Sequence, residues 1–232
     1  MALQPYMAIT STEFYSLSRI PPRPAWMACH FSGHSSGLSN MPDTFPSNSI
    51  IMLDDSIPIQ GHDPQRISNE LAQLYSRIKP DGFLLDFQRT AYAEAAQLAK
   101  HLCLTLPFPV AVSHLYAADL DCPVFLPPPP LHMPLKEYLK AWAGRKIWME
   151  IAPESQIMTV TAEGCQISPG MNADLIEPAF YHENLFCRYH TQVLKDSVIF
   201  TLQRGWQEWE SLCKQAETFG ISVCVGRNEN SR

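Results

Sequence analysis

Short apolar segments of strand length alternate with helical segments over residues 49–116, and this alternation is the strongest constraint on the fold. SIIMLDD (49–55), GFLLDF (82–87) and FPVAVSHLY (108–116) have the length and apolar content of buried strands. Between them lie QRISNELAQLYSRI, whose aliphatic residues recur every three or four positions, and the alanine-rich TAYAEAAQLAKHLC. Strands joined by single helices make right-handed crossovers, so this half of the chain predicts a parallel sheet covered by helices.

Further strand-length segments bring the predicted total to eight. These are residues 25–31, 49–55, 82–88, 109–116, 122–127, 146–152, 197–203 and 221–225. Eight strands predict an α/β fold of the TIM type, a small or incomplete (β/α)8 barrel that lacks two or three of its helices. An open doubly wound sheet is the alternative. We also expect two β-hairpins in the C-terminal half, which turn at Glu163-Gly164 and at Lys195-Asp196.

One domain over residues 1–232 is the expected organisation, because no charge run, Ser/Gly tract or repeat divides the chain. Within it, residues 1–23 are expected to be an N-terminal extension and residues 155–194 a hairpin insertion. Asp63-Pro64 is a helix-start signal, and the apolar residues after it recur at helical spacing, which places Ile67 and Leu71 on one buried face. The sequence therefore predicts that one crossover helix begins here.

Composition excludes several classes of function. A net charge of −6 without clustered Lys and Arg argues against nucleic-acid binding, and no segment approaches the roughly 18 apolar residues of a membrane span. Seven dispersed cysteines without a CxxC pair predict reduced thiols rather than disulfides or a zinc site. The N-terminus lacks the pattern of a secretory signal, so we expect a cytoplasmic protein. We also expect that the protein carries no cofactor. The oligomeric state is left open.

Polar residues recur at the C-terminal ends of the predicted strands, where (β/α)8 barrels build their sites. They are His30, Asp54, Asp55, Asp86, Gln88, His114, Tyr116, Glu150 and Gln203. Alternation along residues 82–88 directs Asp86 and Gln88 to the same face as Leu84. We therefore expect Asp86 and Gln88 to share the barrel interior.

The candidate residues divide into catalytic and binding groups. Asp86, Glu150 and Asp54 are the catalytic candidates, because a carboxylate inside a barrel is costly unless it is used or satisfied. The alternative for Asp86 is a structural ion pair with Arg66 or Arg89. The substrate-binding candidates are Gln88, His30, His114, Tyr116, Asp55 and Gln203. For the two histidines, a hydrogen bond to a backbone carbonyl is the competing interpretation.

The segment DGFLLDFQ resembles the signature of glycoside hydrolase family 18, the chitinases, which reads Asp-Gly-x-Asp-x-Asp-x-Glu. Asp81, Gly82 and Asp86 match it, whereas Leu84 replaces the middle Asp and Gln88 the final Glu. In that family the final Glu is the proton donor. An amide cannot give a proton to a leaving glycosidic oxygen, so the resemblance implies a barrel that lacks the family's general acid.

Three functional hypotheses follow from these residues. The first is a glycosidase-like hydrolase with a rearranged carboxylate pair, and the second is an inactive barrel that binds an oligosaccharide or another polar ligand. The third is a metal-dependent hydrolase in which His30, Asp86, His114 and Glu150 converge on an ion. Because no tight ligand spacing such as His-x-His occurs, we expect no stoichiometric metal.

Overall fold

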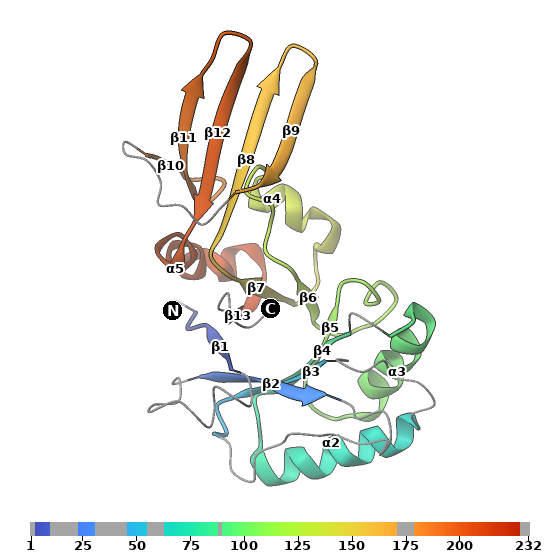
Figure 1. Cartoon of the computed structure of the whole chain (residues 1–232). Helices are drawn as coiled ribbons and strands as arrows, with labels where there is room; N and C mark the ends of the chain where they lie inside the picture. The colour runs from blue at the N-terminus through green and yellow to red at the C-terminus, as the bar shows by residue number, and fades with distance from the viewer. Residues whose placement is uncertain are drawn as a thin grey trace.

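The described chain is built around a closed barrel of eight parallel strands, in the order β1-β13-β7-β6-β5-β4-β3-β2 (Figure 1). This computed structural model describes residues 3–9, 23–30, 46–54, 63–87, 90–170 and 179–227, without the side chains of residues 26–30 and 54. The barrel strands are β1 (Tyr6–Ile9), β2 (Pro24–His30), β3 (Ile50–Asp54), β4 (Gly82–Asp86), β5 (Val110–Ser113), β6 (Val124–Leu126), β7 (Ile147–Ile151) and β13 (Ile221–Gly226). The predicted incomplete TIM-like barrel is confirmed.

Four α-helices occur among the described residues, so the ring of helices outside the barrel is incomplete. They are α2 (Pro64–Ile78), α3 (Tyr92–Thr105), α4 (Leu135–Tyr138) and α5 (Trp206–Gln215), with 3-10 turns η1 (Leu139–Trp142) and η2 (Ala216–Phe219). Helix α2 begins where the sequence indicates, because the Asp63 side chain accepts a hydrogen bond from the Gln65 amide at 3.0 Å. None of the described helices has the length and hydropathy needed to cross a bilayer.

Strand residues alternate between a barrel interior and an outer layer. The interior cluster consists of Tyr6, Ala25, Ile50, Met52, Leu84, Ala111, Phe125, Trp148 and Val225. The outer cluster places Phe83, Leu85 and Phe87 of the β4 segment against the helices. Asp86, two residues after Leu84, therefore belongs to the interior face, as the alternation predicts.

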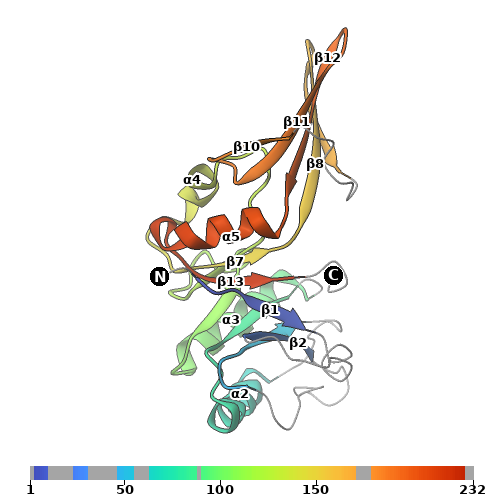
Figure 2. The ribbon, with the colours of Figure 1, turned by 90° about the vertical axis from the view of Figure 1, so that its left-hand side faces the viewer.

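A five-stranded antiparallel sheet is inserted between β7 and α5 and stands away from the barrel (Figures 1 and 2). Its strands are β8 (Glu154–Thr161), β9 (Gly164–Pro169), β10 (Phe180–His182), β11 (Cys187–Val193) and β12 (Ser197–Arg204), in the order β10-β11-β12-β8-β9. The β11–β12 hairpin turns at Lys195-Asp196, as predicted, whereas the β8–β9 hairpin turns at Ala162-Glu163, one residue before the predicted Glu163-Gly164.

The prediction that residues 197–203 form a barrel strand was wrong. This segment is β12, which pairs antiparallel with both β8 and β11 along its length. Its place in the barrel is taken by β1, which pairs with β2 and β13. Tyr6–Ile9, within the segment expected to be an N-terminal extension, therefore form a barrel strand, and the inserted sheet runs to Arg204 rather than ending at residue 194. The strands from β2 to β7 are therefore each one position later in the barrel than predicted, whereas β13 is the eighth strand, as predicted.

Arg204 stabilises the end of the inserted sheet that joins the barrel, where β8 starts and β12 ends. Its side chain is 1% exposed and donates to Glu154 Oε1 at 2.6 Å and to the carbonyl oxygens of Leu185, Phe186 and Pro129 at 2.6–3.0 Å. The guanidinium also stacks 4.7 Å from the ring centre of Trp209 on α5. These contacts join the start of β8, the end of β12, the β10–β11 turn and α5.

At the N-terminal end of the barrel, Asp81 and Gly82 have structural partners. Tyr6 Oη donates to Asp81 Oδ2 at 2.5 Å, and Arg23 both hydrogen-bonds this hydroxyl and lies 3.6 Å from the carboxylate. Burial, followed by the bond to Asp81, raises the pKa of Tyr6 to about 12. Gly82 lies against the indole of Trp148, which fills the interior from β7 on the other side of the barrel.

We predict that Gly82→Ala destabilises the fold by about 1–3 kcal/mol through overpacking. A Cβ at this position would lie 2.9 Å from Cη2 of Trp148 and 3.1 Å from the carbonyl oxygen of Pro109. Denaturant unfolding should show a smaller cost of Gly82→Ala in a Trp148→Phe background, because the shorter ring leaves room. Equal costs in both backgrounds would contradict this packing account.

Candidate functional site

Three charged side chains meet at the C-terminal end of the barrel interior, which we call the mouth. Asp86 is the last residue of β4, Glu150 lies in β7, and Arg227 directly follows β13. Strands β13 and β4 are four positions apart in both directions around the barrel, so they lie opposite each other. Arg227 spans this distance and places Nη2 2.5 Å from Asp86 Oδ2.

Glu150 approaches the same guanidinium from a third strand. Its Oε1 lies 3.7 Å from Arg227 Nε, which is too long for a hydrogen bond, and this buried Nε has no hydrogen-bond partner among the described residues. The Arg227 side chain is 13% exposed and each carboxylate side chain 10%. Because water is largely excluded, the attraction between these charges is stronger than in a surface pair.

Neighbouring groups hold Arg227 in this position. Its backbone N–H donates to the carbonyl oxygen of Ile151 at 2.8 Å, which extends the pairing of β13 with β7 by one residue. Its Cζ lies 5.9 Å from the ring centre of Phe125, an interior residue of β6. The guanidinium therefore has an aromatic neighbour and carboxylates supplied by two other strands.

His114 follows β5 near the same charges and is half-buried. Its backbone N–H donates to the carbonyl oxygen of Phe125 at 2.9 Å. Burial lowers the pKa of the imidazole, while the charge of Asp86 opposes this shift. The neutral imidazole can both donate and accept a hydrogen bond at the mouth.

Tyr138 lies on the Glu150 side, where its hydroxyl donates to the carbonyl oxygen of Pro127 at 2.9 Å. Burial, followed by the charges of Glu150 and Glu154, raises its pKa above the usual value. The hydroxyl therefore stays neutral, and it holds the proline-rich segment after β6 against the barrel.

The structure does not bring all the predicted site residues together. The Tyr116 hydroxyl is buried in the outer layer, where it donates to the Leu85 carbonyl at 3.0 Å and accepts from the Phe87 amide at 2.9 Å. It packs β4 against the β5–β6 connection instead of reaching the mouth. Gln203 lies on β12 of the inserted sheet, paired with Ser155 and Arg188.

The backbone places two more candidates at the level of Asp86. Asp54 is the register partner of Asp86 on one side and of His30 on the other, so all three occupy adjacent positions at the mouth end of β4, β3 and β2. The side chains of His30 and Asp54 are outside the description, as are Asp55 and Gln88 entirely.

Arg227 is the site residue that the sequence reasoning missed. Arg66, one expected partner of Asp86, instead pairs with Glu70 one turn along α2, and Arg89, the other, lies outside the described residues. A signal for Arg227 was present, because it immediately follows the apolar strand ISVCVG. In (β/α)8 barrels, site residues lie at the C-terminal ends of the strands, and Arg227 is at such an end, as Asp86 is.

Metal binding finds no support in the part of the chain that the structure describes. No group of three or more His, Cys, Asp or Glu side chains there is arranged to hold an ion. His30, which the metal hypothesis requires, is among the residues whose side chains lie outside that part.

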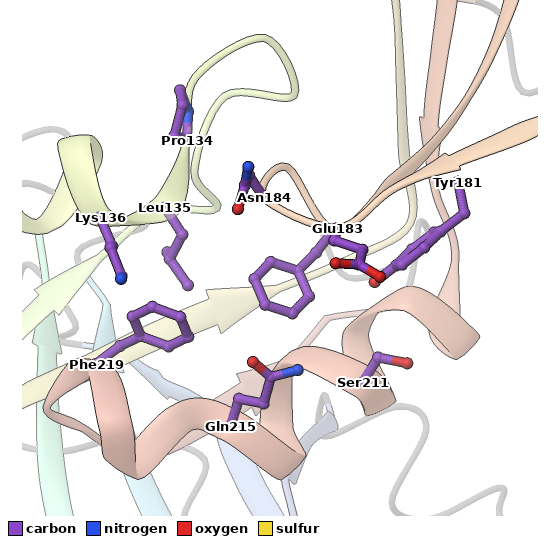
Figure 3. A pocket seen from close by; sticks show the side chains of 10 residues that line it. Pro134, Leu135, Lys136, Tyr181, Glu183, Asn184, Ser211, Gln215 and Phe219 are labelled. Carbon is purple, nitrogen blue, oxygen red and sulfur yellow. The ribbon is translucent and has the colours of Figure 1, made fainter.

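A separate cavity of about 590 Å³ lies between the inserted sheet and the helices (Figure 3). Gln215 and Phe219 line it from the α5–η2 side, facing Leu135 and Asn184. None of the predicted site residues lines this cavity, so it is distinct from the mouth.

Comparisons with known proteins identify the class of fold. No protein-family model matches the chain, and no curated protein matches it either. Among solved structures, the chain is similar to a glycoside hydrolase family 18 N-acetylglucosaminidase from Paenibacillus barengoltzii, with 9% identity and a TM-score of 0.59 over 99% of this chain and 96% of that one. The fold is therefore that of the chitinase-like TIM barrels.

Two further similar structures are an agglutinin and a chitinase. One is a chitinase-like agglutinin from Robinia pseudoacacia, with 10% identity and a TM-score of 0.59, covering 97% of this chain and 94% of that one. The other is a glutamate-to-glutamine mutant of a class V chitinase from Nicotiana tobaccum in complex with NAG4, with 9% identity and a TM-score of 0.60 over 97% and 93%. At these identities the likeness shows the fold alone.

We predict that Arg227→Met lowers the free energy of unfolding by about 3 kcal/mol, because two buried carboxylates lose their counter-charge. Urea denaturation measures this change. The matched control is Arg66→Met, which breaks an exposed helix-surface pair and should cost less than about 0.5 kcal/mol. A similar small loss in both variants would show that the mouth ion pair contributes little. Adding Asp86→Asn should recover part of the loss through coupling between the two sites.

His114 should make the fold less stable in mild acid. Its pKa is lower in the folded protein than the unfolded value of 6.5, so its contribution is fully present above pH 6.5 and is lost as pH falls through the folded pKa. We expect unfolding free energy to drop more steeply between about pH 7 and pH 5 in the wild type than in His114→Gln. Asp86→Asn should steepen the drop, since Asp86 opposes the shift. Parallel curves for wild type and His114→Gln would contradict the assignment.

Proposed function

We propose that this protein binds an oligosaccharide containing N-acetylglucosamine at the mouth of its barrel and does not cleave it by general acid catalysis from β4. The ion pair between Asp86 and Arg227 is the observation that carries this proposal. It connects opposite sides of the mouth and commits the carboxylate of β4 to a cation of the protein itself.

The chemistry of β4 argues against cleavage. The Asp86 carboxylate is engaged by the Arg227 guanidinium at 2.5 Å, so it is poorly placed to donate a proton to a leaving oxygen. Gln88, which stands in the resembling signature where the proton donor would be, is an amide. The segment 82–88 thus contains no group suited to the general acid step.

The same groups suit the binding of hydroxyl and amide groups. Arg227 Nε–H is a buried donor without an acceptor among the described residues, and burial without a partner makes a ligand oxygen favourable there. Carboxylate oxygens of Glu150 and Asp86 accept hydrogen bonds from sugar hydroxyls. The agglutinin and the NAG4 complex among the similar structures support this ligand class.

A second candidate function is hydrolysis with Glu150 as the acid. The position of Glu150 favours it, because this carboxylate is nearly buried at the mouth and lies 3.7 Å from Arg227 Nε. A carboxyl group beside the scissile bond is the residue type that most glycosidases use as the general acid.

Calorimetric titration with NAG4 tests binding. We expect saturable binding to the wild type and an affinity at least roughly tenfold lower for Arg227→Met, which keeps the length of the side chain but removes its donors. Arg66→Met is the matched control and should bind like the wild type. Absence of binding to folded wild-type protein would overturn the proposal.

Release of the aryl group from aryl glycosides of N-acetylglucosamine tests cleavage. We expect little or no activity in the wild type, and at most weak turnover in Gln88→Glu, because Leu84 still replaces the middle Asp of the signature. Strong wild-type cleavage that Glu150→Gln abolishes would instead support the second candidate function.

A further inference from the structure

The inserted sheet has one polar and one apolar face. Residues paired across an antiparallel ladder point to the same side, so the strand register assigns each side chain to a face. Apart from Ile157 and Ile199, the central part of one face is polar, with Thr159, Gln166, Ser168, His190, Gln192 and Thr201. The opposite face, which we call the apolar face, carries Met158, Val160, Ile167, Val193, Val198 and Phe200.

Only the end of the apolar face next to the barrel is covered in the described part of the chain. There, Cys187 and Leu202 are buried against Leu131 of the segment after β6. None of the six residues that define the apolar face is buried, and the side chains of Ile167 and Val193 are 45% and 75% exposed. A sheet that is apolar on one side normally buries that side against a second layer.

The position of the sheet leaves the apolar face accessible to a large partner. The ends of the β8–β9 and β11–β12 hairpins extend beyond the barrel and the helices (Figures 1 and 2). A second molecule can therefore approach this part of the sheet without meeting the barrel of the first.

The size of the apolar face fits another sheet better than a single helix. Five strands about 4.8 Å apart, each with about six residues at about 3.4 Å per residue, outline roughly 24 by 20 Å, or about 500 Å². A helix with a diameter of about 10–12 Å would cover only half of this width. Two such faces together bury roughly 1,000 Å², which is the size of a specific but weak interface.

The charges on the sheet favour a partner with the same surface. The apolar face has no Asp, Glu, Lys or Arg among its six defining residues, so two copies can pack together without taking an unpaired charge out of water. A partner with an ordinary charged surface would lose the hydration of its charges here and gain no counter-charge.

We propose that a second copy of this chain packs its apolar face on the first, so that the two inserted sheets form a β-sandwich across a two-fold axis. Each copy supplies the antiparallel layer that the other lacks, and aligned sheets pack about 10 Å apart with their strands within about 30°. The interface shares no residue with the mouth, so the proposal does not rest on sugar binding there.

Sedimentation velocity at increasing protein concentration tests the dimer. We expect a monomer at about 1 µM and mostly dimer at about 100 µM, because an interface of this size binds weakly.

Lysine substitutions on the two faces locate the interface. Ile167→Lys and Val193→Lys place a charge on the apolar face of both copies, so each should raise the dissociation constant at least roughly tenfold. The matched controls are Gln166→Lys and Gln192→Lys, which add the same charge to an exposed neighbouring residue of the same strand, on the polar face. These controls should dimerise like the wild type, and far-UV circular dichroism checks that all four variants are folded.

The free thiol of Cys165 gives a second, local measurement. Cys165 is exposed and pairs with Val160, so it lies on the apolar face. Its alkylation by iodoacetamide, followed by peptide mapping, should slow in proportion to the remaining monomer as the wild-type concentration rises. In Ile167→Lys the rate should stay that of the monomer up to 100 µM.

Four outcomes would overturn the proposal. They are a wild type that stays monomeric at about 100 µM, a dimer that survives both substitutions on the apolar face, and equal losses in the controls on the polar face. The fourth is a loss of NAG4 binding in monomeric Ile167→Lys that retains its fold, which would assign the apolar face to the ligand instead. Failure of the proposed function would appear separately, as wild-type protein that dimerises but does not bind NAG4.

Discussion

The ion pair between Arg227 and Asp86 connects opposite strands of the barrel and sets the arrangement of charges at its mouth. The partners are separated by 141 residues, and they meet only because the eight strands close into one barrel. Without the guanidinium, the carboxylates of β4 and β7 would face each other in a nearly dry interior, where like charges repel strongly. The closed barrel and this cation therefore depend on each other: closure buries the carboxylates, and the cation makes their burial tolerable.

Each residue that matches the chitinase-like signature has a physical role in this barrel. Asp81 binds Tyr6 and Gly82 accommodates Trp148, both at the N-terminal end, whereas Asp86 binds Arg227 at the mouth. The mismatched Leu84 is fully buried in the interior cluster, where a second carboxylate would need a partner of its own. Architecture alone thus accounts for the retained residues.

The local sequence pattern was sufficient for the helices and most barrel strands, but long-range pairing was not visible in it. Helix α2 is encoded by its Asp63 cap and its apolar period, and β4 by five consecutive buried residues. By contrast, β1 is only four residues long, and the eight-residue β12 looked like the better barrel strand. Whether such a strand joins a barrel or a hairpin depends on its partners, which lie far away in sequence. The pairing of Arg227 with Asp86 was not visible for the same reason, because the partner is on the opposite strand.

Two buried arginines show how structural and functional roles can be separated on physical grounds. Arg204 donates to one carboxylate and three backbone carbonyls and stacks on Trp209, so its donors are committed to holding the inserted sheet. Arg227 is also nearly buried, yet its Nε–H has no acceptor among the described residues and faces Glu150 across 3.7 Å. A buried donor without a partner carries a cost that a bound oxygen atom would remove. This difference between Arg227 and Arg204 is the reason that the proposed binding is placed at the mouth rather than where the inserted sheet joins the barrel.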